Sequence, residues 1–69
     1  MKIRYFADTD TMYIEFNQRP VMETQEINEN TLIDLDAEGV LVAITVEHAR
    51  GATDLSEVSL QQIVGQPAS

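Results

Sequence analysis

Apolar and polar residues alternate along residues 2–16 with the two-residue period of β-strands. In the first segment, Ile3 and Tyr5 are separated by basic residues. In the second, apolar side chains return at every other position, at Met12, Ile14 and Phe16. The four residues between the segments, Ala-Asp-Thr-Asp at 7–10, favour a turn. The pattern therefore predicts a β-hairpin.

Two more strands are predicted between residues 21 and 35. Pro20 lacks an amide donor, so it fits a loop or the start of a strand. Residues 21–27 mix β-branched with many polar residues, which is typical of a solvated edge strand. Asn-Glu-Asn at 28–30 favours a turn, and residues 31–35 form the fourth strand.

The fifth predicted strand, residues 40–46, does not alternate. Its sequence, Val-Leu-Val-Ala-Ile-Thr-Val, is apolar or nearly so on both faces. Such a run is typical of a central strand covered on both sides. One helix covers only one face of a sheet, so we expect a second copy of the chain to cover the other.

A C-terminal helix is predicted from Asp54, because Glu57 three residues later completes a capping box. Gly65 is a natural stop. The apolar positions of this helix would be Leu55, Val58, Leu60, Ile63 and Val64. The expected fold is thus a single α+β domain over residues 1–65. It contains a meander-like antiparallel sheet of about five strands with the helix on one face, and residues 66–69 form a frayed tail.

The composition limits the classes of function. The chain has 69 residues and a net charge of −8. It contains no cysteine, so disulfides and thiolate metal sites are excluded. A core this small gives a thin stability margin, which favours self-association, with a dimer expected. The negative charge disfavours direct binding to nucleic acid. No apolar run is long enough for a membrane span and no signal core is present, so we expect a cytoplasmic protein.

The segment Asp34-Leu35-Asp36-Ala37-Glu38-Gly39 resembles the start of a calcium loop. Such a loop needs a bidentate carboxylate at its twelfth position, which here is Thr45. A hairpin turn explains the same residues better. Asp36 would accept backbone hydrogen bonds, and Gly39 would adopt a positive φ angle.

Other candidate sites are few. If the two acidic turns were neighbours, Asp8, Asp10, Asp34 and Asp36 could hold a divalent cation. A module that binds a small ligand or a divalent metal at this acidic edge is the alternative function that we keep open. His48, the only histidine, ends the apolar register of the fifth strand, and no oriented partner for catalysis is evident. We therefore expect neither an enzyme nor a cofactor.

Several of these motifs together resemble a small prokaryotic family known as domain of unknown function 2283. The matching motifs are Lys2-Ile3-Arg4-Tyr5, Asp10-Thr11-Met12-Tyr13-Ile14, Thr24-Gln25-Glu26 and Asp34 to Gly39. The chain departs from the family pattern at Phe6, Thr45 and Arg50, where aspartate, glutamate and serine are usual. The resemblance covers about residues 1–50 and implies a small antiparallel sheet, but no activity. Family members are thought to occur beside toxin-like proteins, which implies an antitoxin-like role for some.

The leading hypothesis is a non-enzymatic interaction domain that binds a basic, toxin-like protein. Carboxylates would imitate a phosphate track and pair with lysine or arginine of the partner. The candidate residues for this contact are Glu15, Glu23, Glu26 and Glu29.

Overall fold

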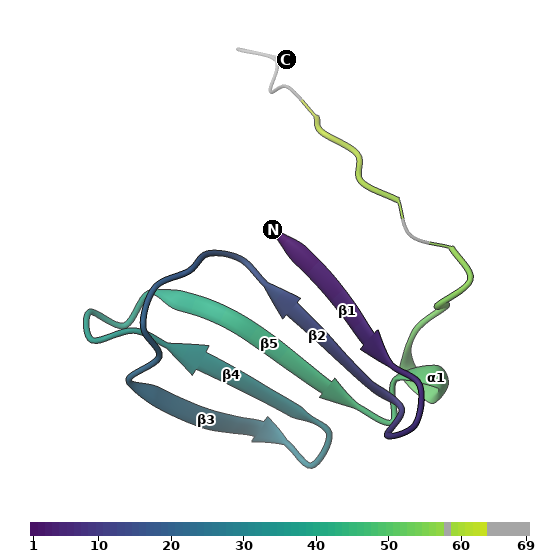
Figure 1. Cartoon of the computed structure of the whole chain (residues 1–69), viewed down its shortest axis with the longest axis horizontal. Coiled ribbons are helices and arrows are strands. Elements are labelled where there is room, and N and C mark those ends of the chain that lie inside the picture. Colours follow the sequence, from purple (N-terminus) through teal and green to yellow (C-terminus); the bar gives the residue numbers. More distant parts are fainter. Residues whose placement is uncertain (58, 64–69) are drawn as a thin grey trace, which may run out of the picture.

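The computed structural model describes residues 1–57 and 59–63 and contains one five-stranded antiparallel sheet (Figure 1). The five predicted strands are confirmed. They are β1 (Lys2–Phe6), β2 (Thr11–Glu15), β3 (Glu23–Asn28), β4 (Thr31–Leu35) and β5 (Leu41–Glu47). The third strand begins at Glu23, two residues later than predicted, although the Met22 amide already donates to the Leu35 carbonyl (2.8 Å).

The order of the strands corrects the expected meander. The sheet runs β1-β2-β5-β4-β3, so the last strand inserts between β2 and β4 instead of lying at an edge. The most apolar strand thereby gains a hydrogen-bonded neighbour on each side, while the polar strand β3 lies at the edge. An aggregation-prone segment is protected in this arrangement.

One face of the sheet is apolar. Residues that pair directly across antiparallel strands lie on the same face, and the register aligns four isoleucines in one row. The row consists of Ile3, Ile14, Ile44 and Ile33. Alternation and register place these apolar residues on this face: Ile3, Tyr5, Met12, Ile14, Phe16, Ile33, Leu35, Val42, Ile44 and Val46. Leu41 joins them opposite Leu35 through the register shift between Asp34 and Leu35, and the polar residues of the face are Thr31, Glu23 and Gln25.

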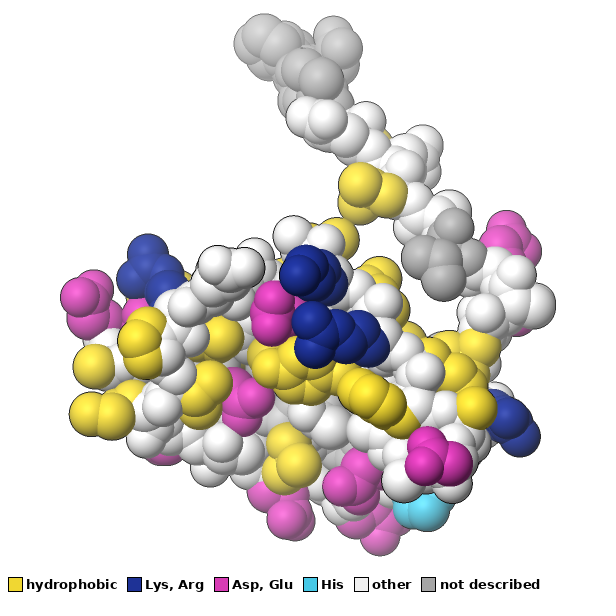
Figure 2. All heavy atoms as spheres, in the orientation of Figure 1, with side chains coloured by type: hydrophobic (Ala, Val, Ile, Leu, Met, Phe, Trp, Pro, Cys, Tyr) yellow, Lys and Arg dark blue, Asp and Glu magenta, His cyan; other side chains and the backbone are white. Residues whose placement is uncertain are grey.

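The opposite, polar face carries most of the strand charges. It consists of Lys2, Arg4, Phe6, Thr11, Tyr13, Glu15, Thr24, Glu26, Leu32, Asp34, Ala43, Thr45 and Glu47. Figure 2 shows basic side chains gathered over β1, the strand that carries both basic residues of this face. Acidic and apolar side chains are interspersed across the same view.

The expected shielding of β5 on both sides is only partly realised. Val42 and Ala43 are buried, with exposed fractions of 3% and 0%, but the other residues of the strand are half-buried or exposed. Within the described part of the chain no large side chain is fully buried. The reason is geometric: the described residues form one layer of sheet, without a second layer on either face (Figure 1).

The predicted C-terminal helix is wrong in position. The helix observed, α1, is a single turn at Ala49–Ala52, and residues 54–57 and 59–63 contain no helix. Asp54 uses its carboxylate locally, accepting bonds from the Ser56 amide (3.1 Å) and hydroxyl (2.6 Å), which stabilises a turn instead of a helix start. Val58, Val64 and Gly65 of the predicted helix, and the predicted frayed tail at 66–69, lie outside the described residues. Among the residues described, no helix is long and apolar enough to cross a membrane.

Candidate functional site

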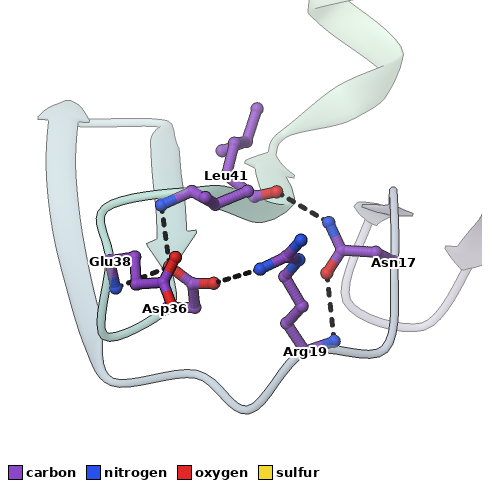
Figure 3. Close-up of polar contacts among 6 residues, drawn as sticks. Asn17, Arg19, Asp36, Glu38 and Leu41 are labelled. Atoms are coloured by element: carbon purple, nitrogen blue, oxygen red, sulfur yellow. Dashed lines mark hydrogen bonds and ion pairs between the residues drawn. The ribbon is translucent and has the colours of Figure 1, made fainter.

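The turn between β4 and β5 is organised by the carboxylate of Asp36 (Figure 3). Its Oδ1 accepts bonds from the amides of Glu38 (2.9 Å) and Val40 (2.8 Å). The Gly39 amide donates to the Asp36 carbonyl (3.1 Å), and Gly39 has a φ of 82°. Both features expected of a hairpin are present, so the prediction that the acidic motif forms a hairpin turn is confirmed.

A second loop is attached to this turn by Arg19. Its Nη1 donates to Asp36 Oδ2 at 3.0 Å, and the two side chains are 51% and 8% exposed. Asn17 supports the arrangement by donating to the Leu41 carbonyl (2.9 Å) and accepting from the Arg19 amide (3.0 Å). The connection between β2 and β3 is thereby fixed beside the turn between β4 and β5 (Figure 3).

The protonation of Asp36 reflects these contacts. The bond from the Val40 amide holds the pKa of this carboxyl below its ordinary value of 3.8; the Glu38 amide and Arg19 act in the same direction, and partial burial opposes them. A pocket of about 300 Å³ lies beside the pair. The described residues that line the pocket include one cation, Arg19, and its guanidinium is already paired with Asp36.

A second polar cluster joins the turn between β1 and β2 to α1. Asp10 Oδ1 accepts bonds from the Tyr5 hydroxyl (2.6 Å) and the Arg50 amide (3.1 Å), and the Asp10 carbonyl accepts from the Ala49 amide (3.0 Å). The Arg50 guanidinium lies 5.9 Å from the centroid of the Tyr5 ring, within the range of a cation–π contact. The contacts fix the short helix against the first hairpin.

Two residues of this second cluster have unusual backbone conformations. Asp10 and His48 both have φ of 55°, which is uncommon for residues other than glycine, although aspartate and histidine tolerate it better than most. His48 was expected to continue the apolar register of β5, but its backbone conformation takes it out of the strand. It is exposed and immediately precedes α1.

The bond between Tyr5 and Asp10 shifts the acid constants of both groups. Donation from the Tyr5 hydroxyl lowers the pKa of Asp10 below 3.8, assisted by Arg50, and the same bond raises the pKa of Tyr5 above 10.0. This carboxylate contributes stability above its unfolded pKa, and the contribution is lost as the pH falls through the lower folded value.

We predict that Tyr5→Phe will raise the pKa of Asp10 toward its ordinary value, because the strongest donor to the carboxylate is removed. An NMR titration of the side-chain carboxyl carbons measures this shift directly. Tyr13→Phe is the matched control, because Tyr13 lies on the opposite face and should leave the titration unchanged. An unmoved Asp10 titration in Tyr5→Phe would contradict the assigned contact.

The four candidate metal ligands are not brought together. The register pairs Thr11 with Glu47 at the end of β5, whereas Leu35 pairs with Leu41 at its start. Asp8 and Asp10 therefore lie at one end of the sheet, and Asp34 and Asp36 at the other. Three of the four accept bonds within the chain, Asp34 from the Thr24 hydroxyl (2.7 Å). In the described ranges, no group of three or more acidic or histidine side chains is arranged to hold a metal ion.

The four acidic residues predicted to bind a partner are divided between the faces. Glu15 and Glu26 lie on the polar face, and Glu15 pairs with Lys2. Glu23 lies on the other face, where it accepts a bond from Gln25 Nε2 (2.9 Å), and Glu29 is in the turn between β3 and β4. The sequence motifs did not indicate Arg19 or Arg50, because their partners are 17 and 40 residues away along the chain.

Together these features define a small single-sheet domain in which the motif carboxylates stabilise turns. The profile of the DUF2283 family, described as proteins of unknown function, matches residues 2–50, and the chain belongs to this family. The matched segment contains both polar clusters, including Tyr5, Asp10, Asp36 and Arg50. No curated protein and no solved structure matches the chain.

Proposed function

We propose that this chain is a non-enzymatic protein-interaction domain that binds a basic protein through its polar face. The distribution of charge on that face carries the proposal. Glu15, Glu26, Asp34 and Glu47 lie on β2 to β5, while both basic residues of the face lie on β1. A partner rich in lysine or arginine would therefore dock over the acidic part of the sheet, away from β1.

The chemistry of the two polar clusters supports a binding role over catalysis. Asp36 is occupied by two amides and Arg19, and Asp10 by Tyr5 and Arg50, so neither carboxylate is free to act as a base. An antitoxin-like role fits an acidic face of this kind, because carboxylates can occupy the cleft in which a basic nuclease holds phosphate groups.

Co-purification of the tagged chain from its native host tests the proposal. We expect a basic protein to be retained at low salt and released at high salt, because exposed charge pairs are screened. The proposal fails if no protein is retained, or if retention is indifferent to salt.

A matched pair of variants locates the binding face. We predict that Glu26→Gln will weaken binding of the captured partner several-fold and reduce its salt dependence, since one carboxylate of the polar face is removed. Glu23→Gln removes the same charge from the same strand on the opposite face and should bind like the parent chain. Equal losses in the two variants, measured by titration calorimetry, would contradict the assignment to the polar face.

A further inference from the structure

We infer that the apolar face is covered by the apolar face of a second copy of this chain, so that the protein is a two-fold dimer of sheets. The inference is independent of the proposed function, because the partner would use the other face. Its basis is the exposed apolar surface: Ile3 and Phe16 are 45% and 38% exposed, and Ile14, Ile33 and Ile44 are only half-buried.

A single layer of this size does not provide a core. A sheet that is apolar on one face must bury that face against another element, and soluble monomers rarely expose a continuous apolar patch of several hundred Å². The row of isoleucines crosses four adjacent strands without a charged residue. At the edge strand β3 the row ends on the neutral side chain of Gln25, and the nearest charge on this face is Glu23. Asp10 and Arg50 contact Tyr5 at one end of the face, and they lie 3.9 Å apart as an ion pair. Burying the row of isoleucines would therefore remove no charge from water.

The dimensions of the face favour a second sheet as the occupant. Five strands of five to seven residues span a plane of about 24 by 17 Å, on the order of 400 Å², and side-chain relief increases the accessible area. Two such faces together make about 800 Å² of flat area, and side-chain relief brings the accessible area toward the lower end of standard interfaces, about 1,200 Å². The C-terminal segment would cover less of the apolar face, because an extended segment is only as wide as one or two of its five strands.

The observed course of the C-terminal segment agrees with this choice. Leu60 and Ile63 are 84% and 79% exposed, and Figure 1 shows the described part of the segment leading away from the sheet.

The net charge of −8 on each chain does not prevent two chains from pairing through their apolar faces. Sheets pack about 10 Å apart, which leaves the two polar faces on the outside, about 20 Å or more from each other. This separation exceeds the Debye length of about 8 Å at physiological salt.

A matched pair of variants in β1 tests the dimer. Ile3 and Phe6 have nearly equal exposure, 45% and 47%, but by strand alternation they lie on opposite faces. In the full-length chain, we expect Ile3→Asp to weaken dimerisation by about 100-fold, because it places a carboxylate inside an apolar interface. Phe6→Asp should change it less than about threefold. Sedimentation equilibrium of both variants over a dilution series measures the two dissociation constants.

Equal dissociation constants for Ile3→Asp and Phe6→Asp would overturn the inference. If Ile3→Asp does not fold, the parent chain provides the decisive measurement, because the unfolding midpoint of a dimer rises with protein concentration. A midpoint that is independent of concentration would overturn the inference as well. The inference would also be overturned if the Leu60→Asp, Ile63→Asp double variant caused the dimer to dissociate. The C-terminal segment, and not the apolar face, would then supply the contact.

Discussion

We expect Ile44→Glu to unfold the protein at room temperature. Ile44 is in the central strand, and its direct neighbours across the sheet are Ile14 and Ile33. In the proposed dimer a second sheet covers this position, so a carboxylate there cannot reach water, and an unpaired charge in apolar surroundings costs about 4 kcal/mol or more. A chain of 69 residues has a total stability of only about 3–10 kcal/mol. Circular dichroism and urea titration measure the loss.

Thr45→Glu is the matched control, because it introduces the same side chain one residue later on the polar face. The family pattern places a glutamate at this position, and we expect the variant to remain folded, with a stability change of about 1 kcal/mol. If the two variants were equally stable, the division of the sheet into an apolar and a polar face would be wrong.

The second large effect is expected at the turn between β4 and β5. Asp36→Ala should lower the melting temperature by about 10 °C, because two hydrogen bonds from turn amides and the hydrogen-bonded ion pair with Arg19 are lost together. Asp36→Asn should lie between the parent chain and Asp36→Ala, since the amide oxygen can still accept from the turn amides. Differential scanning calorimetry separates the three proteins. Equal melting temperatures for Asp36→Asn and Asp36→Ala would show that the turn bonds contribute nothing.

The loss of stability caused by Asp36→Ala should also depend on pH. Its folded pKa is lowered by the turn amides and Arg19, so the carboxylate stabilises the folded chain above the ordinary value of 3.8. That contribution disappears as the pH falls through the lower folded value. The parent chain and Asp36→Ala should therefore differ most near neutral pH and converge in acid. A difference that grows in acid would contradict the assigned contacts.

The strands were predictable because their signal is local. Alternation at Ile3 and Tyr5, and at Met12 and Ile14, identifies a strand without reference to any other part of the chain. The turn at Asp36 and Gly39 was predictable for the same reason, because both residues act within five positions of each other.

The arrangement of the strands required information that no local pattern contains. The two acidic turns lie at opposite ends of the sheet because successive strands alternate in direction, so the four candidate metal ligands are not brought together. The insertion of β5 between β2 and β4 places the end of β5 beside the turn between β1 and β2. The contact between Asp10 and Arg50 depends on the same insertion. The predicted helix failed because its capping signal at Asp54 is equally consistent with a local turn, and short helices without a packed face are marginal in water.

The charge distribution was only partly predictable. Net charge follows from composition, and alternation along the strand already separates Glu23 from Glu26. That Glu26 shares its face with acidic residues of the other strands follows only from the register between the strands. This register allows one face to mediate self-association and the other to bind a basic partner, so the two proposed interactions do not compete.

The mass of the parent chain in solution tests the central claim most directly. The chain has a mass of 7.7 kDa, and sedimentation equilibrium at micromolar concentration should report twice that value, 2 × 7.7 = 15.4 kDa, with dissociation accompanied by loss of structure on dilution. A well-folded particle of 7.7 kDa at every concentration would contradict the claim that a second sheet covers the apolar face.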